Sequence, residues 1–296
     1  ASVLALSLLA ACTSGRGPAA CTYGQASAAC SSGQASAACS YGRGSAAVVE
    51  ESGTAAAIPA ADVAVPGAAA PAATVAGLTP ESYIPEELLP DAVQCMPAPP
   101  DADSPEFAYD RLRYEWGKRQ REDPERLAMA MRDAIWDLDT TIAIMSTPFG
   151  LKVSAAETPH IYKVLTRGIT TIEAIRFRPK AHYFRIRPFA FYGEPSIFPE
   201  DDDWLATEGS YPSGHTIRTW ACALLMAEIN PEAAEAVFAR AWTAGENRVI
   251  AGCHWQSDVD ASRPVASIGY ARLQTSRGFR RDMARAQREF RRWRTG

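Results

Sequence analysis

Residues 209–216 read Gly-Ser-Tyr-Pro-Ser-Gly-His-Thr and run directly into the apolar stretch 217–229, IRTWACALLMAEI. The Pro-Ser-Gly turn predicts that a helix begins here with Ser213 as its N-cap. Free backbone amides around Ser213 and Gly214 would then point outward from the positive end of that helix. Such an end binds anions, and glycine lets the backbone approach them closely. His215 follows and is suited to donate a proton to the anion, although the same four residues are also typical of a capped helix with a surface histidine.

Two of the four histidines in the chain, His215 and His254, lie in short blocks of polar residues. His254 and Asp258 are four residues apart, so on a helix they share a face and the carboxylate can accept a hydrogen bond from one ring nitrogen. That bond would fix the tautomer and leave the other nitrogen as an oriented nucleophile. An isolated pair of this kind is also common on helix surfaces, where it contributes little. Arg248 lies off the face of His254 on a continuous helix, and Gly252 offers a break that brings the two together.

A third block supplies two more basic residues. Lys180 is expected to begin a helical turn, and Pro188 pushes Arg187 out of the α region so that it projects from the end of an element. Each base alone is also typical of a solvated surface. Three cations and two neutral donors suit a phosphoryl group whose charge is spread over three oxygens. With one histidine on each side of that group, the arrangement indicates metal-free phosphoryl transfer. The five donors are Lys180, Arg187, Arg248, the Ser213 hydroxyl and the Gly214 amide.

The three blocks, in this order, resemble the motif of the PAP2 phosphatase and vanadium haloperoxidase superfamily. Their flanks resemble the bacterial class A non-specific acid phosphatases in four stretches: 182–193 (HYFRIRPFAFYG), 209–216 (GSYPSGHT), 227–231 (AEINP) and 254–260 (HWQSDVD). The resemblance covers the chain from about Leu78 to the C-terminus. Asn247 departs from it, because the family usually has serine before the arginine of the last block. We expect this change to retune the site rather than abolish it.

The resemblance implies a role for each residue of the blocks. His254 would attack phosphorus and form a phosphohistidine, and Asp258 would orient it. His215 would protonate the leaving alcohol and then activate water. The resemblance further implies an all-helical, exported enzyme with an acidic optimum that needs no metal or other cofactor and acts on a broad range of small phosphomonoesters, nucleotides included. The phosphate oxygens would be held by Lys180, Arg187, Ser213, Gly214 and Arg248.

Helix signals recur in one form, a capping residue followed by proline at the first helical position. Convincing strand alternation is absent, so the sequence predicts an all-α, single multi-helix domain over residues 78–296. In the second helix we expect the apolar residues at 127, 131, 135, 138 and 142 to face a core. The expected helices span residues 105–121, 124–147, 159–175, 217–229, 231–245, 257–273 and 278–293.

The first 77 residues predict no part of that domain. Residues 1–12 form a short apolar run that resembles the core and lipobox of a bacterial lipoprotein signal, with Cys12 as the lipidated residue; the alternative is an ordinary export signal cut later. We therefore expect an exported protein, periplasmic or lipid-anchored to the cell envelope. Residues 13–77 continue a nine-residue repeat with cysteine at 12, 21, 30 and 39, then become rich in Ala, Val and Pro, which predicts a disordered leader and tether. Metal binding or cross-linking by these cysteines is a less favoured interpretation.

Composition limits the range of partners. The chain has 296 residues and a net charge of −4, so no global charge favours nucleic acid or a membrane surface. Residues 277–294 are rich in arginine and carry apolar residues at helical spacing, which predicts an amphipathic helix with a solvated basic face rather than a nucleic-acid site. The chain has no CxxC motif, and no structural metal is expected. The pairing of Cys95, Cys222 and Cys253, and whether the protein forms a homodimer, are left open by the sequence.

Three other functions compete with the acid phosphatase hypothesis. A membrane lipid phosphatase of the same superfamily would need several apolar spans, which the chain after Cys12 lacks. A vanadate-dependent haloperoxidase shares the anion cage, but the flanking residues and the compact length argue against it. A phosphate-binding surface lipoprotein without turnover would not need both histidines and Asp258. The acidic run at 200–203 could also suggest a metal site, although such runs are more often solvated.

Overall fold

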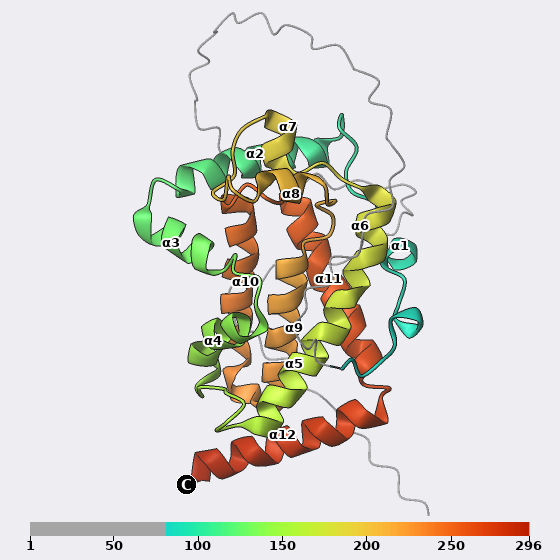
Figure 1. Ribbon diagram of the computed structural model, residues 1–296, viewed down its shortest axis with the longest axis vertical. Helices are drawn as coiled ribbons and strands as arrows, with labels where there is room; N and C mark the ends of the chain where they lie inside the picture. The colour runs from blue at the N-terminus through green and yellow to red at the C-terminus, as the bar shows by residue number, and fades with distance from the viewer. Residues whose placement is uncertain (1–80, 296) are drawn as a thin grey trace, which may run out of the picture. The chain divides into compact units, whose positions relative to one another are not determined.

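The computed structural model describes residues 81–295, which form a helical domain without a strand among them (Figure 1). This confirms the all-α expectation. The expected signal, the repeats and Cys12 lie outside the described residues. The α-helices are α1 (Ala92–Cys95), α2 (Pro105–Gln120), α3 (Pro124–Arg132), α4 (Leu138–Phe149), α5 (Pro159–Glu173), α6 (Phe177–Tyr183), α7 (Pro188–Tyr192), α8 (Asp202–Ala206), α9 (Gly214–Ile229), α10 (Ala234–Ile250), α11 (Gln256–Leu273) and α12 (Arg277–Thr295). Three short 3-10 helices are η1 (Glu86–Leu88), η2 (Ala174–Arg176) and η3 (Pro231–Ala233).

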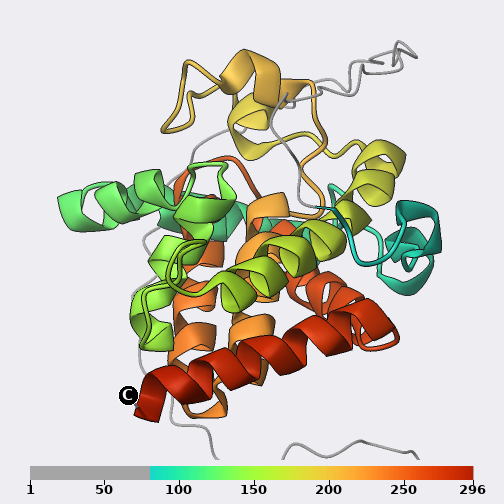
Figure 2. The ribbon, with the colours of Figure 1, turned by 60° about the horizontal axis from the view of Figure 1, so that its bottom comes forward.

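Helix α9 is the central helix, and α5, α10 and α11 pack around it (Figures 1 and 2). Its apolar side chains occur on every side, as expected of a helix surrounded by others. Ile217, Leu225 and Met226 are fully buried. Gly168 of α5 allows the close contact, since a Cβ atom there would lie 2.8 Å from Leu225 Cδ1. The apolar run that follows the PSGH motif therefore builds the core and fixes the position of the motif.

The predicted helix starts are confirmed at three N-caps. The Ser104 hydroxyl accepts a hydrogen bond from the Phe107 amide at 3.1 Å, and Asp123 accepts one from the Glu125 amide at 2.9 Å. Ser213 caps α9 by accepting the Thr216 amide at 3.4 Å. Because each cap satisfies a donor that the first helical turn leaves unpaired, these sequence signals fix where the helices begin.

The single helix expected over residues 124–147 is wrong, because the structure has α3 and α4 with a break between them. Asp133 turns into the protein and forms an ion pair with Arg240, whose Nη1 lies 2.8 Å from its Oδ2. Asp137 then caps α4 by accepting the Thr140 amide at 2.7 Å. As a result Met131 and Ile135, expected in the core, are 45% and 52% exposed. A partner more than 100 residues away in sequence thus interrupts the apolar periodicity.

The connection between α10 and α11 decides where the last block lies. Helix α10 continues to Ile250, beyond the expected end near residue 245, and the chain then turns through Gly252 at φ +78°. That conformation favours glycine, which agrees with the break expected there. Helix α11 begins at Gln256. Arg248 is therefore near the end of one helix and His254 lies just before the next.

The N-termini of α9 and α11 lie at one end of the bundle, beneath α7 and α8, while α12 crosses the opposite end (Figures 1 and 2). In residues 81–295 no helix combines the length and the hydropathy that a membrane span requires. The blocks predicted from the sequence therefore gather at a single end of the domain.

Candidate active site

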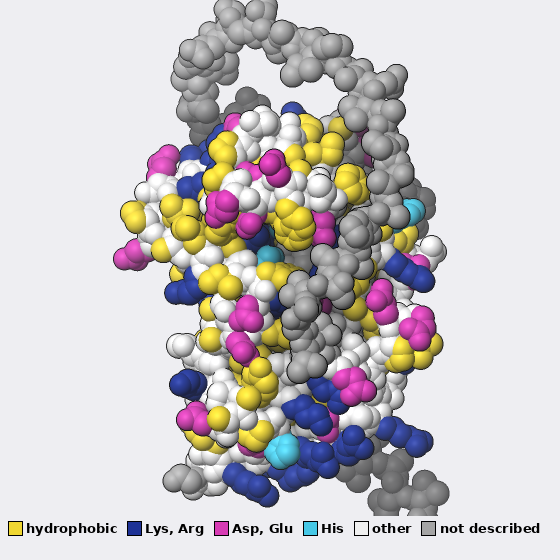
Figure 3. All heavy atoms as spheres, in the orientation of Figure 1, with side chains coloured by type: hydrophobic (Ala, Val, Ile, Leu, Met, Phe, Trp, Pro, Cys, Tyr) yellow, Lys and Arg dark blue, Asp and Glu magenta, His cyan; other side chains and the backbone are white. Residues whose placement is uncertain are grey.

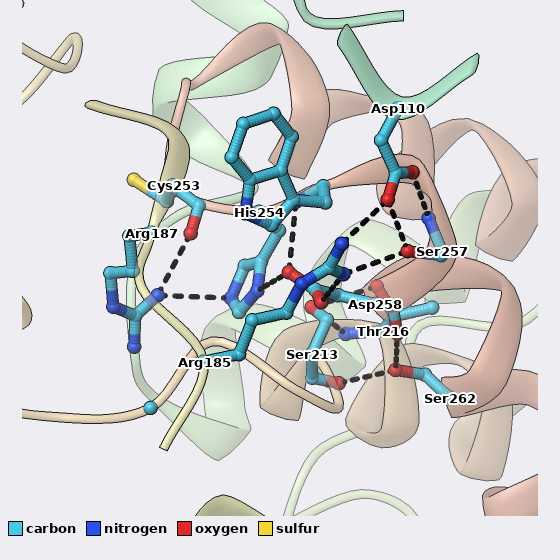
Figure 4. Close-up of polar contacts among 12 residues, drawn as sticks. Asp110, Arg185, Arg187, Ser213, Thr216, Cys253, His254, Ser257, Asp258 and Ser262 are labelled. Atoms are coloured by element: carbon cyan, nitrogen blue, oxygen red, sulfur yellow. Dashed lines mark hydrogen bonds and ion pairs between the residues drawn. The ribbon is translucent and has the colours of Figure 1, made fainter. Parts of the chain in front are cut away.

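Hydrogen bonds join the first turns of α9 and α11. The Ser213 amide donates to the Asp258 carbonyl oxygen at 3.2 Å. The Ser262 hydroxyl lies 2.6 Å from that oxygen and 3.0 Å from the Ser213 carbonyl oxygen (Figure 4). The expectation that the Ser213 amide is free is therefore wrong, because Asp258 of the neighbouring helix accepts it. The Ser213 hydroxyl accepts from Thr216, so its own hydrogen can be donated to a ligand.

His254 lies with its ring between an acid and a base (Figure 4). Its Nδ1 is 3.4 Å from Asp258 Oδ2, and its Nε2 is 3.3 Å from Arg187 Nη1. The carboxylate only accepts and the guanidinium only donates, so Nδ1 carries the hydrogen and Nε2 has the lone pair. The expected contact between His254 and Asp258 is present, but the two residues do not lie on one face of a helix. His254 precedes α11, and Asp258 is in the first turn, where it also accepts the Trp255 amide at 2.8 Å.

A buried network holds Asp258 in place. Arg185 Nη1 donates to Asp258 Oδ1 at 2.6 Å, and its Nη2 donates to Asp110 Oδ2 at 2.7 Å. Asp110 also accepts hydrogen bonds from the Ser257 backbone amide at 2.8 Å and from the Ser257 hydroxyl at 2.5 Å. Both carboxylates are fully buried, and each has several partners. A satisfied buried network of this kind fixes geometry, so the orientation of His254 depends on α2 as well as on α11.

Asp110, Arg185 and Ser257 of this network have no role in the site predicted from the sequence. One signal was present for Asp110, which falls on the buried stripe of α2 together with Phe107 and Tyr114. An acid on an apolar stripe indicates a buried partner. The sequence did not show that the partner would be Arg185, 75 residues away.

Two of the predicted cations lie close to His254. Arg187 has an extended backbone, as Pro188 predicts, and is 4% exposed. Its Nε donates to the Leu205 carbonyl oxygen at 2.8 Å and its Nη1 to the Cys253 carbonyl oxygen at 3.0 Å. Lys180 donates to the Gly209 carbonyl oxygen. Lys180 does not begin a helical turn as expected, because α6 already starts at Phe177 as a direct continuation of η2.

Arg248 is the cation with the fewest partners. It is 3% exposed, and its Nε and Nη1 are buried without a hydrogen-bond acceptor among residues 81–295. Unpaired buried donors are costly and rare in native proteins. A bound anion would satisfy them, so this side chain indicates an anion site at the end of α10.

His215 lies at the start of α9 and contacts the segment between α3 and α4. Its Nε2 donates to the Ala134 carbonyl oxygen at 2.8 Å, which leaves Nδ1 for a proton transfer. The Trp136 ring contacts the imidazole edge to face, with centroids 4.5 Å apart. Arg218 stacks on the same tryptophan at 3.5 Å from its centroid. The break between α3 and α4 therefore supplies both neighbours of this histidine.

Known proteins similar to this chain are acid phosphatases. The family model for the PAP2 superfamily matches residues 161–273. The chain is 40% identical over 201 residues to the non-specific acid phosphatase of Providencia stuartii, covering 68% of this chain and 81% of that protein. It is 36% identical over 200 residues to the non-specific acid phosphatase of Salmonella typhimurium, covering 66% and 78%, and 33% identical over 205 residues to the acid phosphatase of Zymomonas mobilis, covering 69% and 77%.

The chain belongs to the bacterial PAP2 acid phosphatases. All eight residues predicted for the site of this acid phosphatase fall within the matched range 161–273. Asp110, which anchors the Asp258 network, lies outside that range.

Burial and mutual repulsion lower the pKa values of the basic groups in the candidate site. The pKa of His254 lies well below its ordinary value because the ring is buried and Arg187 and Lys180 are close. Burial and Arg248 lower the pKa of His215 in the same way. Burial and Arg187 lower the pKa of Lys180. A bound anion would offset the repulsion from the neighbouring cations and so raise these pKa values.

Asn247, the residue that departs from the family pattern, is fully buried beside Arg248. Its amide nitrogen donates to Asp133 Oδ2 at 2.7 Å, and its oxygen accepts from Arg126 Nη1. In this phosphatase the Asn247 side chain therefore helps to hold the break between α3 and α4.

The cysteines and the acidic run that the sequence left open lie within the described residues. Cys95, Cys222 and Cys253 are free thiols and form no disulfide with one another. In the acidic run, Asp202 accepts the Ser196 amide at 2.9 Å. Within residues 81–295 no three His, Cys, Asp or Glu side chains are grouped as metal ligands would be.

Proposed function

We propose that this acid phosphatase hydrolyses phosphomonoesters without a metal ion, through a phosphohistidine at His254 Nε2. The observation that carries the proposal is the position of the His254 ring. Asp258 holds Nδ1–H at 3.4 Å, and the lone pair of Nε2 points to Arg187, among the cations. A neutral imidazole fixed in this tautomer is a nucleophile aimed at an anion site.

The first step would form a bond from His254 Nε2 to phosphorus and break the bond from phosphorus to the ester oxygen. The electron pair of that bond goes to the leaving oxygen, which takes a proton from Nδ1 of protonated His215. Nδ1 has this role because Nε2 is engaged by the Ala134 carbonyl oxygen. In the second step His215 takes a proton from water, the water oxygen attacks phosphorus, and phosphate and free His254 result.

The donors around His254 would stabilise the charge on the three phosphate oxygens. Arg248 contributes two unpaired nitrogens, and Ser213 can donate its hydroxyl hydrogen. Gly214 has no Cβ atom, and one would fit only tightly, at 3.0 Å from Arg176 Cδ and 3.3 Å from Trp136 Cη2. The amide of this residue can therefore approach an oxygen closely. Fixed donors of this kind stabilise a transition state without reorganising during the reaction.

The physiological setting completes the proposal. We expect small phosphomonoesters, nucleotides among them, as substrates, and an exported enzyme that is periplasmic or attached to the envelope through a lipid at Cys12. The haloperoxidase and the non-catalytic lipoprotein are not favoured, because the curated relatives are acid phosphatases.

The test is hydrolysis of p-nitrophenyl phosphate at mildly acidic pH in excess EDTA. The wild type is compared with His254→Ala and with His160→Ala, a control that removes an exposed histidine far from the site. We expect full activity in EDTA, inhibition by vanadate, and a loss of about 10⁴-fold or more for His254→Ala, because the nucleophile is gone. The control is expected to match the wild type.

Trapping the intermediate separates the two parts of the proposal. Rapid quenching with radiolabelled substrate should give an acid-labile, base-stable phosphoprotein that is absent from His254→Ala. Activity that EDTA removes would contradict the metal-free reaction. Comparable rates in His254→Ala and the wild type would contradict the covalent one.

A further inference from the structure

The last helix of the domain, α12, has a strongly basic outer face. It contains eight arginines, no lysine and two acids, in a chain whose net charge is −4. All eight arginine residues are exposed. In Figure 3 dark blue side chains line the lower edge of the molecule, where α12 crosses in Figure 1. The eight arginines are Arg277, Arg280, Arg281, Arg285, Arg288, Arg291, Arg292 and Arg294.

The arginines are concentrated on one side of the helix. At 3.6 residues per turn, all of them except Arg294 fall within an arc of about 140° around the axis. The row from Arg277 to Arg294 is about 26 Å long at 1.5 Å per residue. The opposite side packs on the bundle through Phe279, Met283 and Phe290, which are almost fully buried. The apolar side is thus already used inside the domain, and the basic side faces outward.

The two acids of α12 offset this charge only in part. Asp282 is 2% exposed and lies 3.1 Å from Lys163 Nζ and 3.2 Å from the Tyr83 hydroxyl. Glu289 accepts the backbone amides of His160 at 3.2 Å and Ile161 at 2.8 Å, so it caps α5. Both carboxylates are directed into the domain, although Asp282 also pairs with Arg281 at 3.7 Å and with Arg285 at 3.5 Å, and Glu232 pairs with Arg294 at 2.9 Å. The other five arginines form no ion pair among residues 81–295, so the outer face keeps a clear excess of positive charge: Arg277, Arg280, Arg288, Arg291 and Arg292.

We propose that the basic face of α12 binds an anionic lipid surface. Arginine is suited to this contact, because its planar guanidinium donates two hydrogen bonds to a phosphate. A helix that lies flat across one end of the domain presents its row of arginines to one plane, which fits a layer of headgroups. The choice of lipid over nucleic acid rests on the expected export of the chain. Binding is electrostatic and peripheral, since the apolar side of α12 is buried.

The contact would also orient the enzyme. Because α12 and the active site lie at opposite ends of the bundle (Figure 1), the site would be held at the end of the domain that is far from the lipid surface. A phosphatase held in this way acts on soluble phosphomonoesters rather than on the lipids to which it is bound.

The test is co-sedimentation of the full chain with vesicles, using Cys12→Ser throughout so that no attached lipid contributes. We expect binding to phosphatidylcholine vesicles that contain phosphatidylglycerol, little binding to phosphatidylcholine alone, and release by high salt. The double variant Arg288→Glu/Arg291→Glu should bind at least about tenfold more weakly. The control is Arg111→Glu/Arg119→Glu, which reverses two exposed charges on α2 and should bind like the parent.

Hydrolysis of p-nitrophenyl phosphate in solution checks the folding of each variant, and hydrolysis by the vesicle-bound parent checks the orientation; every protein is expected to be active. Equal binding to both kinds of vesicle, or unchanged binding of the α12 variant, would overturn the proposal. So would tighter binding to double-stranded DNA than to the anionic vesicles under the same salt, since it would assign the face to nucleic acid.

Discussion

The two helix starts that meet at the site hold their histidines in different ways. At α11, His254 is fixed by Asp258, which is itself bound by Arg185 and by the Trp255 amide. At α9, His215 has one hydrogen bond, to the neutral Ala134 carbonyl oxygen. One ring is therefore held by a buried charged network, and the other by one main-chain hydrogen bond and its contact with the Trp136 ring.

This difference matches the two proposed roles. A nucleophile needs one tautomer and one direction throughout the reaction, which a carboxylate fixed on both sides provides. A proton donor that becomes a base must change its charge within each turnover. A neutral carbonyl allows this, because it binds Nε2–H whether or not Nδ1 is protonated.

Replacing Asp258 with asparagine should cost the most. The side-chain oxygen of asparagine can still accept a hydrogen bond from the Trp255 backbone amide. It is no longer a charged acceptor for Nδ1–H of His254, so the tautomer of His254 is no longer fixed. We expect kcat for p-nitrophenyl phosphate to fall by about 10³–10⁴-fold, as is typical of a carboxylate that orients a catalytic histidine. The matched control is Asp260→Asn on the same helix, where the carboxylate is 51% exposed and pairs with Arg263. A loss below tenfold for Asp258→Asn would show that the network does not set the orientation.

Replacing His215 with alanine should have an effect that depends on the substrate. An alkyl leaving group needs a proton in the first step, whereas p-nitrophenolate leaves readily without one. We expect kcat/KM to fall by about 10²–10³-fold for glycerol phosphate and by clearly less for p-nitrophenyl phosphate. The ratio kcat/KM is the quantity to compare, because it reports the steps up to the first irreversible one. Equal losses on both substrates would assign His215 to binding instead, and His182→Ala provides an exposed histidine as the control.

The smallest expected effect concerns stability. Burial and Arg248 lower the pKa of His215 in the folded protein. In the unfolded chain a histidine has its ordinary pKa of about 6.5, so at a pH just below this value the unfolded chain binds more protons than the folded one. Stability should therefore fall as the pH falls through this window. A bound anion raises the pKa of His215, which makes anion binding stronger as the solution becomes more acidic.

Sulfate is the suitable probe, because its charge stays constant over this range. We expect it to raise Tm by a few degrees more near pH 5 than near pH 7. The pH dependence should shrink in His215→Ala, and the lowered pKa of His254 is expected to account for what remains. A sulfate effect on Tm that is the same at both pH values would contradict an anion site beside a titrating histidine.

The site was predictable where its residues form local signals. The Ser213 cap, the Gly252 break and the extended Arg187 follow from neighbouring residues, and the structure shows all three. What the sequence could not show are contacts between distant segments. Asp133 interrupts a helix because Arg240 attracts it, and Asp110 supports Asp258 through Arg185. Periodicity along one helix contains no information about such partners, so the break before α4 and the network around Asp258 required the structure.

The bonds among Ser213, Asp258 and Ser262 have a consequence for how the activity is acquired. Ser262 and Ser213 are 49 residues apart, and their hydrogen bond forms only when α9 and α11 pack side by side. Because the two histidines proposed to be catalytic flank this junction, we expect a chain in which either helix is undocked to have no activity. During refolding, turnover of a chromogenic ester would then report the packing of α9 against α11, because activity should not appear before this contact has formed.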